Sequence, residues 1–221
     1  MIVILEDLLN PIEVTRVRDA LIRAQWQDGA GTAGRHARMV KNNEQAMGPD
    51  VDAARRLIAE ALSRSELFNA AAMPRGMTPI MFSRYRPGME YGTHIDNAMM
   101  PSGSGRVRTD LAMTVFLSDP ESYSGGALSI SGAMEKEIRL PAGSAVLYPA
   151  TTLHRVTPVE SGERLAAILW VQSVVREEAA RETLYDLSRA RRMILDSEGK
   201  TEAFDLIAKS HANLMRRWAE I

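Results

Sequence analysis

Two of the four histidines stand in patterns that could hold a metal ion. His94 lies two residues before Asp96, and residues two apart in a strand point to the same side, so both could bind one ion. His154 lies 60 residues after His94, shortly after an apolar run. The other two histidines, His36 in a polar segment and His211 in a charged one, show no such pattern. The candidate metal ligands are therefore His94, Asp96 and His154.

The absence of cysteine limits the ligands of any metal ion to histidine and carboxylate groups. Two imidazoles and one carboxylate on a β-rich scaffold form the facial ligand set of non-haem Fe(II) oxygenases, which leaves coordination positions open. Those positions must take a cosubstrate and dioxygen. The residue types and their order therefore indicate oxidative chemistry at an iron ion.

Arg164 lies ten residues after His154, at the start of an apolar run that reaches Trp170. In a strand, Arg164 and Trp170 would share one face. An arginine on the inner face of a β-structure is a buried charge, which is costly unless a carboxylate meets it. Guanidinium binds carboxylate through two parallel hydrogen bonds, so Arg164 is a candidate for binding an acidic cosubstrate.

The candidate residues lie among short apolar or alternating runs that predict strands. Turn signals such as Pro87-Gly88 and Gly125-Gly126 separate these runs. Repeated short strands of this kind predict a β-sandwich, jelly roll or barrel. The expected strands cover residues 80–85, 111–117, 128–130, 138–140, 145–148 and 165–171.

Helices are expected on both sides of this β-rich core. Asn10-Pro11 and Glu13 predict a capped helix that runs to about Trp26, and Asp50 begins a second amphipathic helix. After Arg176, apolar residues at helical spacing predict two or three helices that pack on the core or form a homodimer. We expect an α+β chain with a mainly β core. Its parts are an N-terminal helical support (1–77), a core (78–175) and a C-terminal helical extension (176–221).

Two polar segments have no assigned place in this scheme. Residues 97–109, which include the patch Pro101-Ser102-Gly103-Ser104-Gly105, read either as a mobile lid that contacts an anionic group or as an exposed strand connection. Lys41, Asn42 and Asn43 could form a second wall of a substrate site, although their spacing does not require it.

The composition excludes several classes of protein. The chain has 221 residues, of which 45% are hydrophobic and 25% charged, as in an ordinary globular protein. A net charge of -1 gives no broad field that would attract nucleic acid or acidic membranes. The apolar start is too short for a signal peptide, and no apolar run could span a membrane. We expect a cytoplasmic protein without nucleic-acid or membrane partners.

Several stretches of the sequence match a known family. They are residues 85–97 (YRPGMEYGTHIDN), 116–120 (FLSDP), 125–128 (GGAL) and 154–159 (HRVTPV), with 40–45 (VKNNEQ) and 211–218 (HANLMRRW) outside the core. In these stretches the chain resembles the prolyl-4-hydroxylase-like branch of the Fe(II)/2-oxoglutarate dioxygenases, and more closely the PKHD-type hydroxylases. The resemblance covers nearly the whole chain, and its core motifs specify the chemistry but not the substrate.

The resemblance implies a double-stranded β-helix with a defined site. His94, Asp96 and His154 would bind Fe(II), and Arg164 would bind the distal carboxylate of the cosubstrate 2-oxoglutarate. Tyr85 matches a tyrosine that lies beside the cosubstrate in related enzymes. A second such tyrosine of some relatives would fall near Phe116, which lacks a hydroxyl group.

The implied activity is hydroxylation of an unactivated C–H bond, with dioxygen as co-reactant and release of succinate and carbon dioxide. Asp96 occupies the coordination position that related halogenases leave for chloride, so the resemblance favours hydroxylation over halogenation. L-ascorbate is a candidate reductant. Peptidyl proline, a free amino acid and a siderophore-like metabolite remain open as substrates.

Three other readings of the sequence stay open. The first is an iron-binding, cupin-like sensor or binding module without turnover, which 2-oxoglutarate-dependent succinate release would exclude. The second is a zinc hydrolase, which would be active with Zn(II) rather than Fe(II). The third is a purely structural interaction protein, which only the amphipathic C-terminal segment favours.

Overall fold

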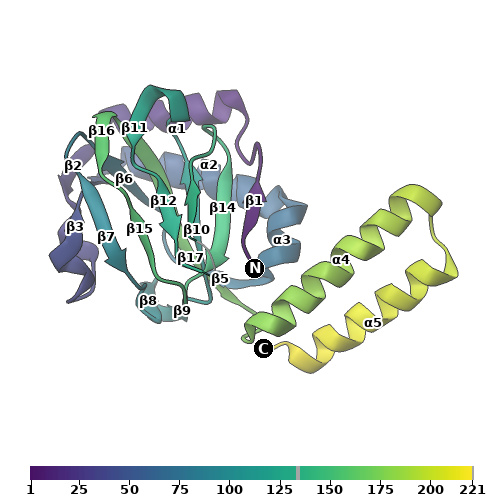
Figure 1. The fold of residues 1–221 in the computed structure, drawn as a ribbon. Coiled ribbons are helices and arrows are strands. Elements are labelled where there is room, and N and C mark those ends of the chain that lie inside the picture. Colours follow the sequence, from purple (N-terminus) through teal and green to yellow (C-terminus); the bar gives the residue numbers. More distant parts are fainter. Residues whose placement is uncertain (133–134, 221) are drawn as a thin grey trace.

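The chain folds around two antiparallel β-sheets that face each other (Figure 1). The computed structural model describes residues 1–132 and 135–220. Within those residues the larger sheet has eight strands in the order β1-β14-β10-β17-β6-β4-β2, with β5 beside β17. Its strands are β1 (Val3–Leu5), β2 (Gln25–Asp28), β4 (Glu44–Met47), β5 (Pro74–Met77), β6 (Met81–Tyr85), β10 (Leu111–Phe116), β14 (Ala145–Pro149) and β17 (Arg164–Ser173).

The smaller sheet has five described strands in the order β13-β12-β15-β7-β3. They are β3 (Lys41–Asn42), β7 (Glu90–His94), β12 (Leu128–Ile130), β13 (Lys136–Ile138) and β15 (His154–Val156). Two further strand pairs lie outside both sheets: β8 (Met99–Ser102) with β9 (Gly105–Arg108), and β11 (Tyr123–Gly125) with β16 (Val159–Gly162). The mainly β core with flanking helices confirms the expected fold class. The strand expected at 138–140 begins and ends two residues earlier.

The first helix begins where its capping residues predict and ends earlier than expected. Helix α1 (Pro11–Arg23) is preceded by Asn10, whose side chain accepts a hydrogen bond from the Glu13 amide, while the Glu13 carboxylate accepts one from the Asn10 amide. The expected end near Trp26 is wrong, because residues 25–28 form β2 and pair with β4. Sheet pairing here overrides the local helix propensity.

Three helices cover the outer face of the larger sheet (Figure 1). They are α1, α2 (Asp50–Arg64) and α3 (Glu66–Ala72). Along β10, Met113 and Val115 join the buried cluster under these helices, whereas Ala112 and Phe116 join the cluster between the two sheets. The larger sheet is therefore buried on both faces, which explains why every residue of β10 is buried.

The first 77 residues contribute more to the sheets than their helical patterns predict. β2 and β4 extend the larger sheet beyond β6, and β3 adds an edge strand beside β7 of the smaller sheet. These strands consist mostly of polar residues, so no period-two apolar pattern marks them in the sequence. Because β3 and β4 follow each other along the chain, one segment reaches from one sheet to the other.

The segment 97–109 forms a β-hairpin. β8 and β9 pair from Met99 with Arg108 to Ser102 with Gly105. Arg108 donates hydrogen bonds to Asp110 at 2.6 Å and to Glu220 at 3.1 Å. This arginine is therefore already paired with carboxylates, and the segment matches the expected strand connection better than an anion-binding lid.

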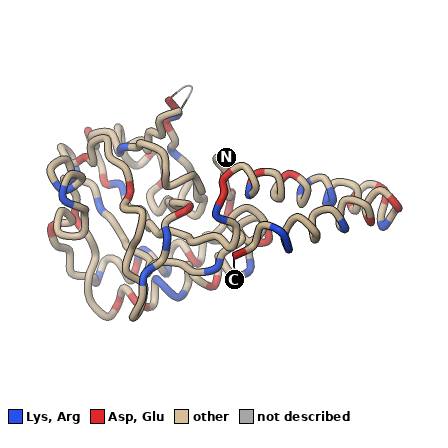
Figure 2. The backbone as a smooth tube through the Cα atoms, turned by 90° about the horizontal axis from the view of Figure 1, so that it is seen from below, with Lys and Arg blue, Asp and Glu red and all other residues tan. Residues whose placement is uncertain are grey.

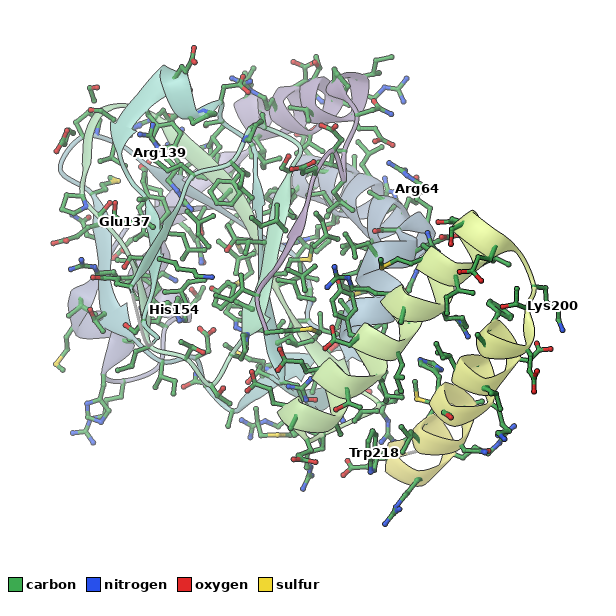
Figure 3. The ribbon with its side chains drawn as sticks, turned by 45° about the vertical axis from the view of Figure 1, so that its right-hand side comes forward. Arg64, Glu137, Arg139, His154, Lys200 and Trp218 are labelled. Atoms are coloured by element: carbon green, nitrogen blue, oxygen red, sulfur yellow. The ribbon has the colours of Figure 1, made fainter. Side chains whose placement is uncertain are left out.

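Two C-terminal helices form a hairpin that extends away from the β-core (Figure 1). They are α4 (Glu178–Glu198) and α5 (Glu202–Trp218). Leu184 and Trp218 pack with Met73 and Val175 at the base of the hairpin, whereas Lys200 lies at its tip (Figure 3). Basic and acidic residues are interspersed along this hairpin and over the core (Figure 2). In the part of the chain that the structure describes, none of the helices has the length and apolar character needed to cross a membrane.

The layer of helices makes a prediction for stability. Ile58 of α2 is fully buried against the larger sheet, whereas Ile22 of α1 is 80% exposed. We expect Ile58→Ala to lower the free energy of unfolding by about 2–5 kcal/mol because it leaves a cavity. Ile22→Ala, the matched control, should change it by no more than about 0.5 kcal/mol. Urea unfolding followed by circular dichroism measures both, and equal effects would contradict this packing.

Candidate metal centre

The pairing of β7 with β15 brings two distant histidines together. His94, at the end of β7, lies directly opposite His154, at the start of β15. Their ring centroids are 4.3 Å apart. The two-residue spacing from His94 suggested that Asp96 lies in the same strand, but Asp96 lies beyond the end of β7. Its carboxylate nevertheless lies next to the two imidazoles.

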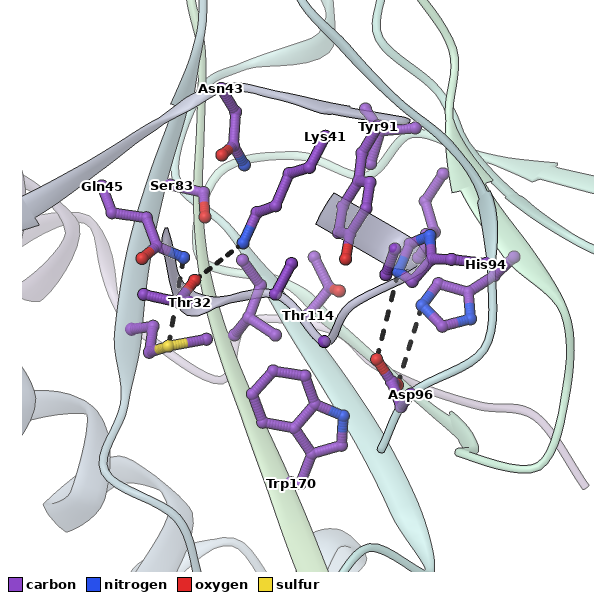
Figure 4. Close-up of a pocket in the computed structure, with 18 of the residues that line it drawn as sticks. Thr32, Lys41, Asn43, Gln45, Ser83, Tyr91, His94, Asp96, Thr114 and Trp170 are labelled. Carbon is purple, nitrogen blue, oxygen red and sulfur yellow. Dashed lines mark hydrogen bonds and ion pairs between the residues drawn. The ribbon is translucent and has the colours of Figure 1, made fainter. Parts of the chain in front are cut away.

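The three side chains converge through specific atoms (Figure 4). His94 Nε2 lies 4.0 Å from Asp96 Oδ1, and His154 Nε2 lies 3.7 Å from Asp96 Oδ2. One ligand atom of each residue lies within 4.8 Å of the others. All three side chains are buried, with at most 6% of each exposed. The structure thus places the sequence-predicted ligands in one cluster.

Backbone carbonyl groups define the orientation of both imidazoles. His94 Nδ1 lies 2.8 Å from the carbonyl oxygen of Gly92, and His154 Nδ1 lies 2.9 Å from that of Thr152. A carbonyl oxygen can only accept, so each Nδ1 carries the proton and each Nε2 presents a lone pair. Burial, and to a lesser extent His154, lower the pKa of His94 to about 3, so this imidazole is neutral near pH 7.

This arrangement of donors fits a divalent metal ion. Two imidazole lone pairs face the Asp96 carboxylate, and Asp96 Oδ2 is buried without a hydrogen-bond partner. Burial raises the pKa of Asp96 because a carboxylate in this apolar setting is poorly solvated. A cation between the three groups would satisfy all of these atoms at once. Two imidazoles and one carboxylate suit Fe(II) and leave open coordination positions.

A bulge in β7 brings Tyr91 beside His94. The pairs step from His154–His94 to Val156–Tyr91, so β7 holds one residue more than β15 over this stretch. Tyr91 and His94 are three apart, and their rings stack with centroids 3.6 Å apart and planes at 13°. Tyr148 meets His154 edge-on at 5.3 Å. Aromatic packing therefore restrains both imidazoles. The stacking of Tyr91 on His94 could not be predicted from the sequence, because residues three apart in a regular strand point to opposite sides.

Arg164 lies in the same cavity as the metal centre, on β17 opposite Tyr85 of β6. It is only 1% exposed, and its guanidinium lies 5.2 Å from the Tyr85 ring centroid and 5.5 Å from that of Phe116. Arg164 Nε has no hydrogen-bond partner, and among the described residues no carboxylate lies within 4.0 Å of this side chain. A buried, unpaired guanidinium fits a ligand that brings its own carboxylate.

Gly126 makes room for the stem of Arg164. A Cβ atom at position 126 would lie 3.1 Å from Arg164 Cδ and 2.9 Å from Val159 Cγ2. The φ angle of +60° at Gly126 also disfavours other residues. Glycine is therefore required at position 126 both by its φ angle and by the space that the Arg164 side chain occupies.

The cavity holds further polar groups, and its volume is about 720 Å³ when counted to its open mouth. Thr114 and Tyr148, which both carry a hydroxyl group, also line it. Trp170 lines it near Asp96, and its indole nitrogen is buried without a hydrogen-bond partner. Sequence reasoning placed Trp170 on this face but assigned no role to Tyr91 or Tyr148.

Comparison with known sequences agrees with this geometry. A sequence model of the 2OG-Fe(II) oxygenase superfamily matches residues 80–172. A PKHD-type hydroxylase of Synechococcus elongatus is 49% identical, and one of Gloeothece citriformis is 46% identical. Both alignments cover 100% of this chain and of the relative. The expected enzyme class is therefore confirmed.

Solved structures show the same fold. A viral collagen prolyl hydroxylase from Paramecium Bursaria Chlorella virus-1 aligns with a TM-score of 0.56 and 21% identity over 78% of this chain and 96% of its own. A prolyl hydroxylase from Trichoplax adhaerens aligns with a TM-score of 0.57 and 18% identity over 78% and 83%, respectively. The two facing sheets are thus the expected double-stranded β-helix. Because relatives nearly half identical match it from end to end, the chain belongs to the PKHD-type hydroxylases of the 2OG-Fe(II) oxygenase superfamily.

Proposed function

We propose that the protein hydroxylates an unactivated C–H bond of its substrate in a reaction that depends on Fe(II) and 2-oxoglutarate. One oxygen atom of dioxygen would enter the product as a hydroxyl group, and the other would enter succinate as 2-oxoglutarate loses carbon dioxide. The observation that carries this proposal is a single cavity that contains both the His94, Asp96 and His154 cluster and the unpaired guanidinium of Arg164.

Each group has a distinct role in this proposal. His94, Asp96 and His154 would hold Fe(II), which when bound supplies the redox chemistry that activates dioxygen. Arg164 would bind the distal carboxylate of 2-oxoglutarate, and Tyr85 would pack beside the cosubstrate. The walls of the cavity would orient the substrate and exclude water.

The similar solved structures support one of the three candidate substrate classes. Two of the similar solved structures are prolyl hydroxylases, which supports peptidyl proline as one candidate beside free amino acids and siderophore-like metabolites. To identify it, purified enzyme with Fe(II), 2-oxoglutarate and L-ascorbate is incubated with cell extract. We expect a metabolite that gains one oxygen atom in step with succinate. A protein that binds iron but releases no succinate in any extract would instead be the binding module without turnover.

The metal centre can be tested without a substrate. Anaerobic protein with Fe(II) and 2-oxoglutarate should develop a visible charge-transfer band. His154→Ala should abolish the band and weaken Fe(II) binding at least about 100-fold. The loss of a residue that only hydrogen-bonds a metal ligand already lowers metal affinity about 10–100-fold. The control His211→Ala removes a histidine of α5 outside the cavity and should keep both. A folded wild-type protein that binds iron but shows no band would contradict the proposal.

The cosubstrate site predicts a separation of iron and 2-oxoglutarate binding. Arg164→Ala should keep Fe(II) but weaken 2-oxoglutarate binding by about 2–5 kcal/mol, which is at least about thirtyfold in Kd. Titration of the charge-transfer band measures this Kd. An unchanged Kd would show that Arg164 does not bind the cosubstrate.

Gly126→Ala tests the packing around Arg164 with a matched control. Its methyl group should displace the Arg164 stem and raise the Kd of 2-oxoglutarate at least about fivefold, which corresponds to about 1 kcal/mol. Gly88 also has a positive φ of +83°, but a Cβ there would meet no atom within 4 Å. Gly88→Ala should therefore carry a similar backbone cost, of about 1–2 kcal/mol, without changing the Kd. Equal Kd values for the two variants would argue against this steric role.

A further inference from the structure

One polar segment closes the cavity between the two sheets. Within residues 41–47, β3 pairs with β7 of the smaller sheet, with Lys41 opposite Tyr91. β4 pairs with β6 of the larger sheet, with Glu44 opposite Arg84. The segment therefore bridges the edges of both sheets beside the metal centre.

Side chains of this segment alternate between the cavity and the outside. Lys41, Asn43 and Gln45 line the cavity (Figure 4). Asn42, by contrast, donates a hydrogen bond to the carbonyl of Gly88, and Glu44 accepts one from Arg84 at 2.7 Å. The alternation presents an ammonium group and two amides to the space that a substrate would enter.

Lys41 carries a positive charge that makes no direct ion pair within residues 1–132 and 135–220, although the charges of Asp96 and Asp28 act on it from further away. Its Nζ donates to Thr32 Oγ1 at 2.9 Å and lies 5.1 Å from the Tyr91 ring centroid. Among the described residues, no carboxylate lies within 4.0 Å of this nitrogen. The side chain is half-buried and reaches into the cavity (Figure 4). An ordinary surface lysine, by contrast, extends its ammonium group into solvent. Burial lowers the pKa of Lys41 to about 8, so it is mostly protonated at pH 7.

Asn43 adds a buried amide beside Lys41. It is only 3% exposed, and neither its amide nitrogen nor its amide oxygen makes a hydrogen bond of good geometry among the described residues, although its side chain lies near the Tyr85 hydroxyl. Its backbone carbonyl accepts a hydrogen bond from Gly29 at 2.8 Å, and a Cβ at Gly29 would lie 2.0 Å from Asn43 Oδ1. The chain thus makes room for a buried amide without a hydrogen bond, which is unfavourable until a ligand supplies the missing partner.

The charges in the cavity point to an anionic substrate. Among its lining residues, Lys41 and Arg164 are cationic and Asp96 is anionic, which leaves one net positive charge with neutral histidines. Fe(II) and the 2-oxoglutarate dianion would cancel each other. One positive charge would then remain, and Arg164 would already be paired with the cosubstrate. A single carboxylate on the substrate balances this charge, whereas a phosphate dianion would exceed it.

We propose that Lys41 and Asn43 bind a carboxylate of the primary substrate, so that the substrate is a compound with a free carboxylate. This inference rests on the proposed function and adds the class of substrate. The ammonium of Lys41 and the amide nitrogen of Asn43 would each donate a hydrogen bond to the carboxylate. The group would replace the missing partners of both side chains in one step.

Lysine-selective NMR tests this binding without turnover. The sequence holds only four lysines, so protein with ¹³C-labelled lysine gives four ε-methylene signals, and Lys41→Gln assigns the signal of Lys41. The protein is loaded with Zn(II), which is diamagnetic, and saturated with 2-oxoglutarate, which occupies Arg164. Acetate is then titrated into the protein. Acetamide, which has the same shape without the charge, and inorganic phosphate are titrated in separate experiments.

We expect acetate to shift the Lys41 signal alone, acetamide to have no effect, and phosphate to bind at least about tenfold more weakly. Saturation-transfer signals of bound acetate should persist in Lys209→Gln, which removes an exposed lysine of α5, and should fall at least about tenfold in Lys41→Gln. Equal binding of acetate and acetamide, tighter binding of phosphate, or unchanged acetate binding to Lys41→Gln would each overturn the proposal.

The same variant separates this inference from the proposed function. Lys41→Gln should leave the Kd of 2-oxoglutarate, measured by the charge-transfer band, within about twofold of the wild-type value. A loss as large as that of Arg164→Ala would make Lys41 a cosubstrate residue and overturn the substrate assignment. An absent band in the wild-type protein would instead count against the proposed function, while the acetate titration would still report on Lys41.

Discussion

Within the described residues, the charged groups at the centre of this molecule keep buried polar atoms without hydrogen bonds. Asp96 Oδ2 and Arg164 Nε are buried without hydrogen bonds, although each belongs to a group that water would solvate strongly. Burial of an unpaired charge costs several kcal/mol, so the surrounding structure must keep these side chains from turning toward solvent or toward each other. Ligands that neutralise them recover that cost, which makes the polarity of the cavity a source of binding free energy.

Burial of the larger sheet on both faces supplies the rigidity that this requires. Along β17, Ala167, Leu169 and Val171 pack under the helices, while Arg164 and Trp170 face the cavity. Stability and binding therefore depend on alternate residues of the same strand. Cores packed in this way resist small displacements, since their side chains fill the space almost completely. The C-terminal hairpin packs on this core mainly at its base, and further along α4 Tyr185 packs against the main cluster and Arg192 pairs with Glu66 of α3.

Sequence patterns predict those parts of the molecule whose physics is local. The capping box of α1 and the apolar strands β10 and β17 follow from spacing and residue type, and the residue types and order of His94, Asp96 and His154 identify the ligands that the pairing of β7 with β15 then brings together. Contacts made across sheets were not predictable in this way. The end of α1 depends on the pairing of β2 with β4. The direction of Lys41 depends on β3 and β4 joining different sheets, and polar residues give no period that would signal this.

The bulge in β7 makes chain length part of the metal centre. In a regular strand, residues three apart point to opposite sides, so Tyr91 and His94 could not stack. The extra residue places them on one side, and the positions between them, Gly92 and Thr93, matter through their number. A one-residue deletion there would make the strand regular and leave Tyr91 and His94 two apart, on one side of the sheet but about 6–7 Å apart along the strand instead of stacked. The turn between α4 and α5 lies at the tip of the hairpin, away from the two sheets (Figure 1), so its length is not part of the metal centre.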